Sequence, residues 1–193
     1  MTATPWGYEV DGTLAPLVSA AELRTIAPTL SSTDVQLTAA LSGVSQAVRS
    51  WCGWHIGPSL RCTYTGRGDG TLLMLPSMGV TAVHSLEIGG EAVDPSDYSW
   101  DASGMVRLKS GVFPSEFRSV TCEYTAGFCT PDVRSAVSQI ALNAITAAPG
   151  VREEHAGQVG ITYNQTGAGI SGGVSLLDRD LKLLAPYRLS RAW

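Results

Sequence analysis

The stretch Val120-Thr-Cys-Glu-Tyr-Thr-Ala-Gly-Phe-Cys-Thr-Pro-Asp-Val-Arg-Ser-Ala-Val137 decides the fold class, because its hydrophobic period changes along its length. The first part alternates apolar and polar residues, which predicts a strand at 120–125. The second part predicts a helix, since Pro131 is a favoured first-turn residue and Thr130 a suitable N-cap. The apolar residues of this helix recur at three- and four-residue steps: Val133, Val137, Ile140, Ala141 and Ala144.

Four more strands are predicted upstream of this stretch, at 60–65, 71–75, 80–88 and 105–108. The segments between them are rich in glycine, proline and aspartate, which is typical of turns. They are too short to hold a crossover helix, so neighbouring strands must run antiparallel. The pattern therefore predicts an antiparallel meander or a small barrel.

Two helices are predicted before these strands. Ser19 and Glu22 form a capping box that opens a short helix at 20–27, and Pro28 ends it. A second helix of about 18 residues ends before Gly53. One apolar stripe runs along this helix: Leu37, Leu41, Val44, Val48 and Trp51.

The order of these elements predicts an α+β fold, with a helical bundle, an inserted small antiparallel β lobe and a C-terminal arm that ends in a short helix. Within the arm we expect a short strand at 159–163 and a flexible glycine-rich linker at 165–173. We predict four parts. Residues 1–18 form an extended N-terminal segment, and residues 19–57 with 130–150 form the helical body. Residues 58–129 form the inserted β lobe, and residues 151–193 form the C-terminal arm with its terminal helix.

Composition excludes several classes of protein. The 193 residues carry 13 basic and 17 acidic side chains, a net charge of -4. A dedicated DNA-binding surface would need a basic stripe, which this balance disfavours. The longest apolar stretches fall far short of the ~18 residues that span a bilayer. The first residues lack the basic and apolar regions of a secretory signal, so we expect reduced cysteines.

The cysteines and histidines give little support for a metal or catalytic centre. No two of the four cysteines have CxxC spacing. The strongest metal set would be Cys52, His55 and Cys62, but we favour small buried hydrophobic side chains at both cysteines. None of the histidines lies near a suitable nucleophile in the sequence. We therefore expect no catalytic residue, no metal and no cofactor.

Two weak motifs have simpler interpretations. Gly167-Ala-Gly169-Ile-Ser-Gly172 matches the letters of a dinucleotide loop, but the chain ends too soon for the second strand and acidic residue of that fold. A hinge or linker is the better interpretation. Arg67, Arg107 and Lys109 would form a basic loop aimed at phosphate, and ordinary exposed charge is the favoured alternative.

The C-terminal segment carries a leucine-rich helix predicted at 175–184. Leu177, Leu181 and Leu184 would share one side of it. A helix of this length is marginal alone, so it must dock on its own body or in a partner's groove. The preceding glycine-rich tether favours the partner slightly.

Several pieces of the sequence occur together in a known family. They are the 17–24 helix, Trp51-Cys-Gly-Trp54, the 80–94 strand pair with Tyr98-Ser-Trp100, Val120 to Phe128 followed by Pro131-Asp-Val133, and Leu183-Leu-Ala-Pro-Tyr-Arg188. With these pieces in this order, the chain resembles the head–tail connector (head-completion adaptor) proteins of long-tailed bacteriophages and gene-transfer agents. Trp54-His55 departs from the pattern, because the resemblance leads us to expect a basic residue there.

The resemblance implies a non-enzymatic virion protein at the head–tail junction, present in the host cytoplasm during assembly. It implies a homo-oligomeric ring, typically a dodecamer, that binds under the portal protein and extends the channel for double-stranded DNA without binding DNA specifically. A tail-side neck or stopper protein would dock on it, and no membrane is involved. The helices at 31–54 and 131–148 would form the ring body. The C-terminal element would reach the portal through Leu176, Leu177, Leu181, Leu184, Tyr187 and Arg188.

Two other interpretations stay open at this point. The chain could be a tail-completion or stopper protein that binds the tail tube, which pull-downs against portal and tail tube would separate. It could also be an enzyme or small-ligand protein that uses the β lobe as a pocket, which native mass spectrometry would reveal through a bound ligand.

Overall fold

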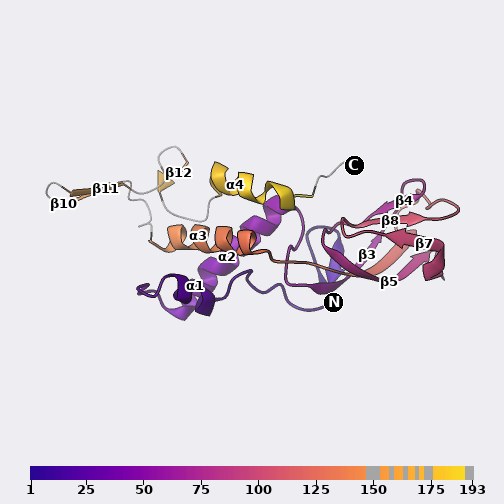
Figure 1. Cartoon of the computed structure of the whole chain (residues 1–193), viewed down its shortest axis with the longest axis horizontal. Coiled ribbons are helices and arrows are strands. Elements are labelled where there is room, and N and C mark those ends of the chain that lie inside the picture. The colour runs from indigo at the N-terminus through magenta and orange to yellow at the C-terminus, as the bar shows by residue number, and fades with distance from the viewer. Residues whose placement is uncertain (147–152, 157–158, 163–164, 168–169, 172–175, 190–193) are drawn as a thin grey trace. The chain divides into compact units, whose positions relative to one another are not determined.

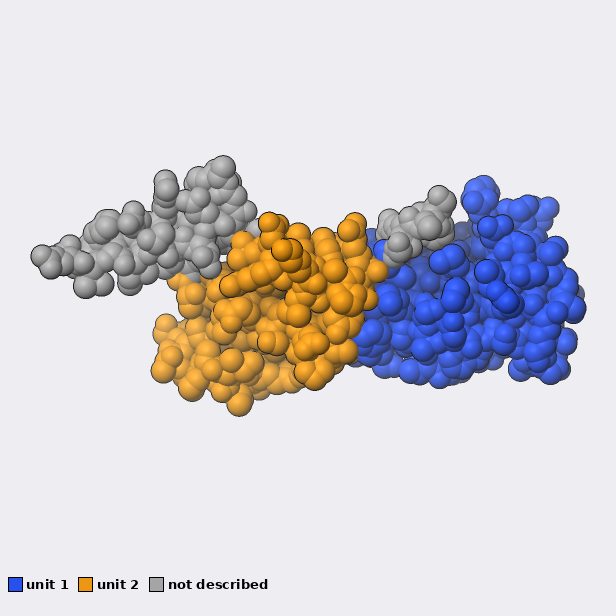
Figure 2. All heavy atoms as spheres, turned by 45° about the horizontal axis from the view of Figure 1, so that its top comes forward, with its two compact units in different colours: residues 1–14, 53–128, 189–193 blue, residues 15–52, 129–188 orange. Residues whose placement is uncertain are grey.

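The computed structural model describes residues 1–146, 153–156, 159–162, 165–167, 170–171 and 176–189. The chain forms two compact units from interleaved segments, coloured separately in Figure 2. The β unit comprises residues 1–14, 53–128 and 189–193, and the helical unit comprises residues 15–52 and 129–188. The predicted α+β class with a short C-terminal helix is confirmed. The segment boundaries predicted from the sequence stay a prediction.

The helical unit is built from α1 (Ala20–Ile26), α2 (Asp34–Cys52), α3 (Pro131–Thr146), α4 (Asp178–Leu184) and the 3-10 turn η2 (Ala185–Tyr187) (Figure 1). The predicted capping box is confirmed, since Ser19 Oγ accepts the Glu22 amide at 3.2 Å and the Glu22 carboxylate accepts the Ser19 amide at 2.8 Å. The predicted apolar stripe of α2 is buried, and α2 packs against α3. The buried residues of the stripe are Leu37, Leu41, Val44 and Val48.

Two buried polar side chains of α2 hold the segment that leads into α1. Ser45 Oγ accepts the Leu17 amide at 2.9 Å, and the Arg49 guanidinium donates to the Ala15 carbonyl at 2.7 Å. A buried backbone group without a partner costs free energy, so these bonds fix the path of this segment along α2. The segment therefore delivers α1 to a defined place in the helical unit.

The β unit contains two antiparallel sheets. The larger has the order β1-β2-β3-β9-β5-β6, and the smaller has the order β4-β8-β7. All five predicted strands are present. The simple meander is wrong, because β9 pairs with both β3 and β5 at the centre of the larger sheet. The strand bounds are β1 (Thr2–Ala3), β2 (Tyr8–Val10), β3 (Leu60–Gly66), β4 (Leu72–Met74), β5 (Val80–Ile88), β6 (Glu91–Ala92), β7 (Tyr98–Trp100), β8 (Met105–Leu108) and β9 (Val120–Ala126), with a 3-10 turn η1 (Pro95–Asp97).

Strand β9 supplies the centre of the β-unit core. Its side chains alternate between buried and half-buried positions, as a strand with one core face should. Val120, Cys122 and Tyr124 are completely buried, and the Tyr124 hydroxyl lies 3.0 Å from the Ser77 hydroxyl. A buried hydroxyl needs such a partner, so this bond completes an otherwise apolar core.

The N-terminal segment is part of this unit through His55. The imidazole of His55 is buried. Its Nδ1 lies 2.8 Å from the Tyr8 hydroxyl, and its Nε2 lies 3.0 Å from the Ala126 carbonyl oxygen. The His55 amide also donates to the Tyr8 hydroxyl at 3.0 Å. Trp54 packs edge-on against His55 and also contacts Phe128. His55 is thus a structural link between β2 and β9.

Short strands also lie between α3 and α4: β10 (Glu153–Ala156) pairs with β11 (Val159–Thr162), and β12 (Gln165–Gly167) pairs with β13 (Ile170–Ser171). β11 lies in the predicted strand at 159–163. The glycine-rich stretch predicted as a flexible linker at 165–173 contains the paired strands β12 and β13, and its flexibility stays a prediction. No helix among the described residues is long and apolar enough to cross a membrane.

Candidate docking surfaces

The first candidate surface is the C-terminal segment formed by α4 and η2. Helix α4 begins at Asp178 and not at residue 175. The Asp180 carboxylate accepts the Leu177 amide at 3.0 Å, while the Leu177 carbonyl accepts the amides of Asp180 and Leu181. An acidic side chain in the first turn also suits the positive end of the helix dipole. Asp180 therefore fixes where this short helix starts.

Packing and side-chain contacts attach this segment to its own unit. Leu184 is completely buried, and α4 packs against α3. The Thr130 hydroxyl, just before α3, donates to the Tyr187 hydroxyl at 2.9 Å. The Arg188 guanidinium lies 5.2 Å from the centre of the Trp51 ring near the end of α2, a cation–π distance. The segment therefore bridges the end of α2 and the start of α3.

The six residues predicted to bind a portal fall into different environments. Leu184 is buried in the helical unit, whereas Arg188 is exposed. Half-buried positions are occupied by Leu176, Leu177, Leu181 and Tyr187. The exposed side of α4 instead presents Leu183 with Asp178, Arg179 and Lys182. Of the two docking modes expected from the sequence, the structure has the helix on its own body, and portal binding by these residues stays a prediction.

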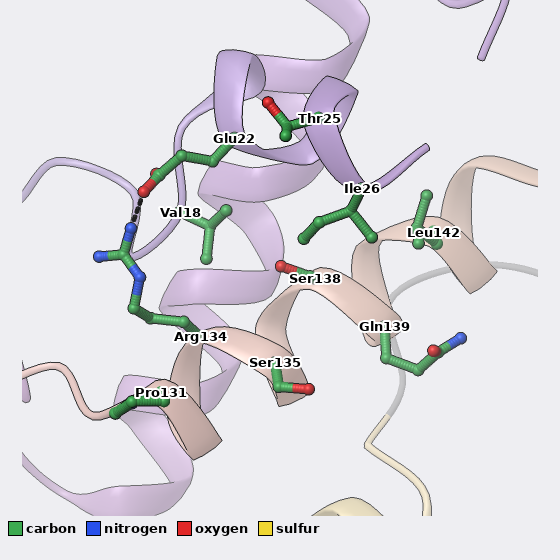
Figure 3. Close-up of a pocket in the computed structure, with 10 residues that line it drawn as sticks. All are labelled: Val18, Glu22, Thr25, Ile26, Pro131, Arg134, Ser135, Ser138, Gln139 and Leu142. Carbon is green, nitrogen blue, oxygen red and sulfur yellow. Dashed lines mark ion pairs between the residues drawn. The ribbon is translucent and has the colours of Figure 1, made fainter. Parts of the chain in front are cut away.

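The second candidate surface is a groove between α1 and α3, which sequence reasoning missed. Its volume is about 540 Å³ (Figure 3). Val18, Ile26 and Leu142 give it apolar walls, and Ile26 is 59% exposed. Polar groups stand around them: Glu22, Thr25, Arg134, Ser135, Ser138 and Gln139, with Pro131 at the start of α3. The one sequence signal for it is Ile26, an apolar residue in the last turn of α1, one turn after the buried Leu23.

An ion pair crosses this groove. Arg134 of α3 binds the carboxylate of Glu22 on α1, as the dashed line in Figure 3 shows. Both side chains are partly exposed, so the pair contributes little stability and mainly aligns the helices. The described residues that line the groove supply hydroxyls, an amide and a neutralised ion pair, and among them no nucleophile stands beside a base. Its chemistry suits an apolar side chain of another polypeptide better than a reacting substrate.

The cysteines and histidines are structural where the structure describes them. Burial raises the pKa of Cys52, Cys62 and Cys122 to about 12, so these thiols are protonated at neutral pH and are poor nucleophiles. Both ring nitrogens of His55 have protein partners, and His84 lies 2.7 Å from the Thr125 hydroxyl. Across the described ranges, no three His, Cys, Asp or Glu residues form a group that could hold a metal ion.

The basic residues singled out in the sequence lie in different elements of the β unit. Arg67 stacks on the Phe117 ring with its guanidinium 5.1 Å from the ring centre. Arg107 lies on β8, and Lys109 follows it. The side chain of His155 and all side chains of the 167–172 glycine motif lie outside the described residues.

Comparison with protein families gives a match over residues 17–142, to the family described as Head completion protein. This range contains α1, α2, most of the β unit and the greater part of α3. No curated protein sequence matches the chain.

Solved structures share the fold at low sequence identity. A chain of the neck of an empty GTA particle, determined with C6 symmetry, is 16% identical with a TM-score of 0.61. A chain of the neck of a native GTA particle, determined with C12 symmetry, is also 16% identical, with a TM-score of 0.57. A chain of the virion of a native gene transfer agent particle is 16% identical, with a TM-score of 0.61. Each match covers 96% of this chain and 97% of the other. At this identity the likeness establishes the fold.

Proposed function

The chain belongs to the head completion protein family, and from this we propose that it is a structural subunit of a virion neck, at the junction of head and tail. In this role it forms a homo-oligomeric ring under the portal, extends the DNA channel and offers a docking surface to a tail-side protein. The observation that carries the proposal is that the family match and the fold match to neck chains cover the same two units. The role is structural and not catalytic.

The charge of the chain supports a channel wall. A ring that surrounds DNA must let it pass, so tight binding to phosphate would oppose ejection. With 13 basic against 17 acidic residues, the chain is electrostatically neutral to repulsive toward DNA. We therefore expect double-stranded DNA to pass through the ring without specific contacts.

The C-terminal segment supports a contact with the portal. Its helix has seven residues, too few to be stable alone, and its described contacts include a buried leucine, a hydroxyl pair and a cation–π contact at an exposed arginine. Such a segment can leave its own unit at small cost and bind a neighbouring protein, where the ordering entropy is offset by new contacts. Leu176, Leu177, Leu181, Leu184, Tyr187 and Arg188 would then face the portal.

Binding to the isolated portal ring tests this function. The full chain mixed with purified portal at micromolar concentration should give a ring-shaped co-complex in negative-stain images. A full chain that stays unbound at all concentrations would contradict the proposal. Because the free chain need not form rings, the images of the mixture decide and the state of the free chain does not.

Tail-side binding is tested separately. Purified tail tube should not capture the chain in the absence of portal, whereas portal should capture it in the absence of tail. The reverse result would favour the tail-completion interpretation considered above.

A further inference from the structure

The loop between β8 and β9 presents an aromatic side chain to solvent. Phe117 is 82% exposed and Val112 is 67% exposed, although both belong to the β unit, which has a large core. Arg67, at the turn between β3 and β4, stacks on the Phe117 ring, and Arg118 follows it in the chain. Neither arginine has an ion pair within the part of the chain that the structure describes. We call Phe117, Val112, Arg67 and Arg118 the knob.

The knob is held in a fixed conformation by its own unit. Phe113 is buried and packs so closely on Gly68 that a Cβ at that position would lie 2.2 Å from it. The Phe113 amide donates to the Gly70 carbonyl at 2.7 Å, and the Ser119 hydroxyl donates to the Glu116 carbonyl at 2.8 Å. Arg118 has a φ of 62°, which a residue other than glycine adopts only at a cost. A rigid loop that displays an exposed aromatic ring is typical of a protein-binding hot spot.

A second apolar surface lies on the outward face of the smaller sheet. Met74 of β4 and Met105 of β8 are directly opposite each other and are 53% and 41% exposed. Their neighbours Leu73 and Val106 point the other way and are completely buried. Beside Met105, the Asp101 carboxylate accepts the Met105 and Ser103 amides. We call Met74, Met105 and Asp101 the platform.

Asp101 provides a permanent negative charge on the platform. Hydrogen bonds from the Ser103 side chain and from nearby backbone amides hold the pKa of this exposed carboxyl below its usual range. It is therefore ionised at neutral pH. No ion pair to Asp101 is formed by the residues that the structure describes.

The knob and the platform lie at opposite ends of the same pair of strands. The knob loop is bonded to the start of β4, where Thr71 and Gly70 accept the amides of Leu108 and Phe113. The platform lies at the end of β4, where Leu75 donates to the Gly104 carbonyl. Two different patches on one unit can join copies head to tail, because each copy offers one patch to each neighbour.

We infer that the knob of one copy docks on the platform of a second copy, with Phe117 against the paired methionines Met74 and Met105 and a knob arginine beside Asp101. The chemistry of the two surfaces is complementary. Thioether sulfurs make favourable contacts with aromatic rings, and methionine adapts its shape to the ring it meets. An arginine and a carboxylate of opposite charge fix the register of such a contact. Phosphate would complement only the arginines and would leave Phe117 and Val112 in water, so nucleic acid fits the knob less well.

The inference deepens the proposed function, because a head-to-tail contact with a closing rotation generates a ring. Each copy would give its knob to one neighbour and its platform to the other. The contact would lie in the β unit, in addition to any contacts that the helical units make.

Photo-crosslinking from position 117 is the direct test. Phe117 is replaced by p-benzoylphenylalanine in the full chain, which is irradiated alone at up to about 1 mM, where even a weak contact with a Kd of about 1 mM is populated. A second sample contains the same chain bound to its portal. We expect covalent dimers in both, with the crosslinked peptide containing residues 72–75 or 105–107. Adducts mapped to DNA, to another protein or to other parts of this chain, or no dimer in either sample, would overturn the inference.

Substitutions measure the strength of the contact. Phe117→Ala and the double change Met74→Ser with Met105→Ser should each weaken self-association about tenfold or more. Val35→Ala is the matched control, since Val35 is 79% exposed on α2 of the other unit, and it should change nothing. Because all these side chains are exposed, thermal unfolding should be preserved, which separates loss of contact from loss of fold.

A mixture of the two variants gives a result that only a head-to-tail contact explains. A knob variant keeps its platform and a platform variant keeps its knob, so together they should form one-to-one dimers and nothing larger. Dimers from either variant alone, or larger assemblies from the mixture, would contradict the arrangement. If the chain fails to bind portal, the proposed function fails, while crosslinking of the free chain still decides this inference.

Discussion

The two ends of the described chain are attached in different ways. The N-terminal strand β2 enters the larger sheet, buries Val10 and Tyr8, and shares a closed set of hydrogen bonds with His55. In the C-terminal segment Leu184 is completely buried, whereas Tyr187, which bonds to Thr130, is half-buried and Arg188, which lies over the Trp51 ring, is exposed. The N-terminal end is therefore part of a core, whereas the C-terminal end rests on one. Only the C-terminal segment can leave its unit and bind a partner at a small cost in free energy.

Removal of residues 174–193 is the strongest test of this difference. The truncated chain should lose all binding to portal rings, because the segment proposed to make the contact is gone. Its thermal midpoint should fall by only a few degrees, since about 2 kcal/mol of burial at Leu184 is lost. Negative-stain imaging and calorimetry measure the two effects. Complete unfolding of the truncated chain would show that the C-terminal helix belongs to the core after all.

A pair of matched substitutions, Tyr8→Phe and Tyr187→Phe, compares the two ends directly. Tyr8→Phe removes the hydroxyl that contacts His55 Nδ1 and accepts the His55 amide, and should lower the free energy of unfolding by about 2–3 kcal/mol. Tyr187→Phe removes one contact of a half-buried hydroxyl and should cost about 0.5–1 kcal/mol. Urea unfolding gives both values. Equal losses at the two positions would remove the distinction between the ends.

Leu184→Ala tests how independently the C-terminal helix behaves. A buried leucine in a fixed core costs about 2–5 kcal/mol when it is truncated. Here the loss should be only about 1–2 kcal/mol, because α4 can undock and limit the damage. Leu41→Ala, at a completely buried position in α2, is the control and should show the full cost. A loss at Leu184 as large as that at Leu41 would contradict separate undocking.

Arg188→Gln should have the smallest effect, which thiol labelling can detect. The positive charge of Arg188 acts on Cys52, so the C-terminal segment lies close to this buried thiol. Loss of the cation–π contact, about 0.5–1 kcal/mol, should raise the rate of Cys52 labelling about two- to fivefold through more frequent undocking. Cys62 and Cys122, in the other unit, serve as internal controls and should keep their rates.

The pH dependence of stability follows from the same thiols. Burial raises the pKa of Cys52, Cys62 and Cys122 from 9.0 to about 12, so the folded state keeps protons that the unfolded state loses. This contribution is complete below pH 9 and is lost as the pH rises from 9 toward 12. In a Cys122→Ala variant, the free energy of unfolding measured in urea should fall less steeply as the pH rises above 9. If it falls as steeply as in the unchanged protein, the Cys122 thiol is not buried in its protonated form.

Local patterns predicted most regular elements. Helices α1, α2 and α3 follow from the capping box, the apolar stripe and the Thr130-Pro131 start. Strands β3, β5, β8 and β9 follow from alternation, and β4 follows from the apolar run at 71–75. Strands β1, β2 and β7 have only two or three residues, so no period can develop in them. The central position of β9 was not predictable either, because partner choice depends on contacts far apart in the sequence.

Candidate surfaces were less predictable than elements. Leucine spacing correctly indicated a C-terminal helix, but not that Leu184 is buried while Leu183 is 44% exposed. The start of α4 depends on the Asp180 carboxylate, and its docking on Thr130 and Trp51 joins residues that are far apart in the chain. The role of His55 likewise depends on Tyr8, 47 residues away. Such pairings arise from the folded backbone and leave no local signal.

The central place of β9 has a consequence for how the protein is made. Strands β3 and β5 are both synthesised before β9 and can already pair with β2 and β6, but only β9 joins these two halves into one sheet. Helix α3, which follows directly, is likewise the late partner of α2. The nascent chain thus carries two incomplete units until the ribosome has passed residue 146, and one short stretch then closes both.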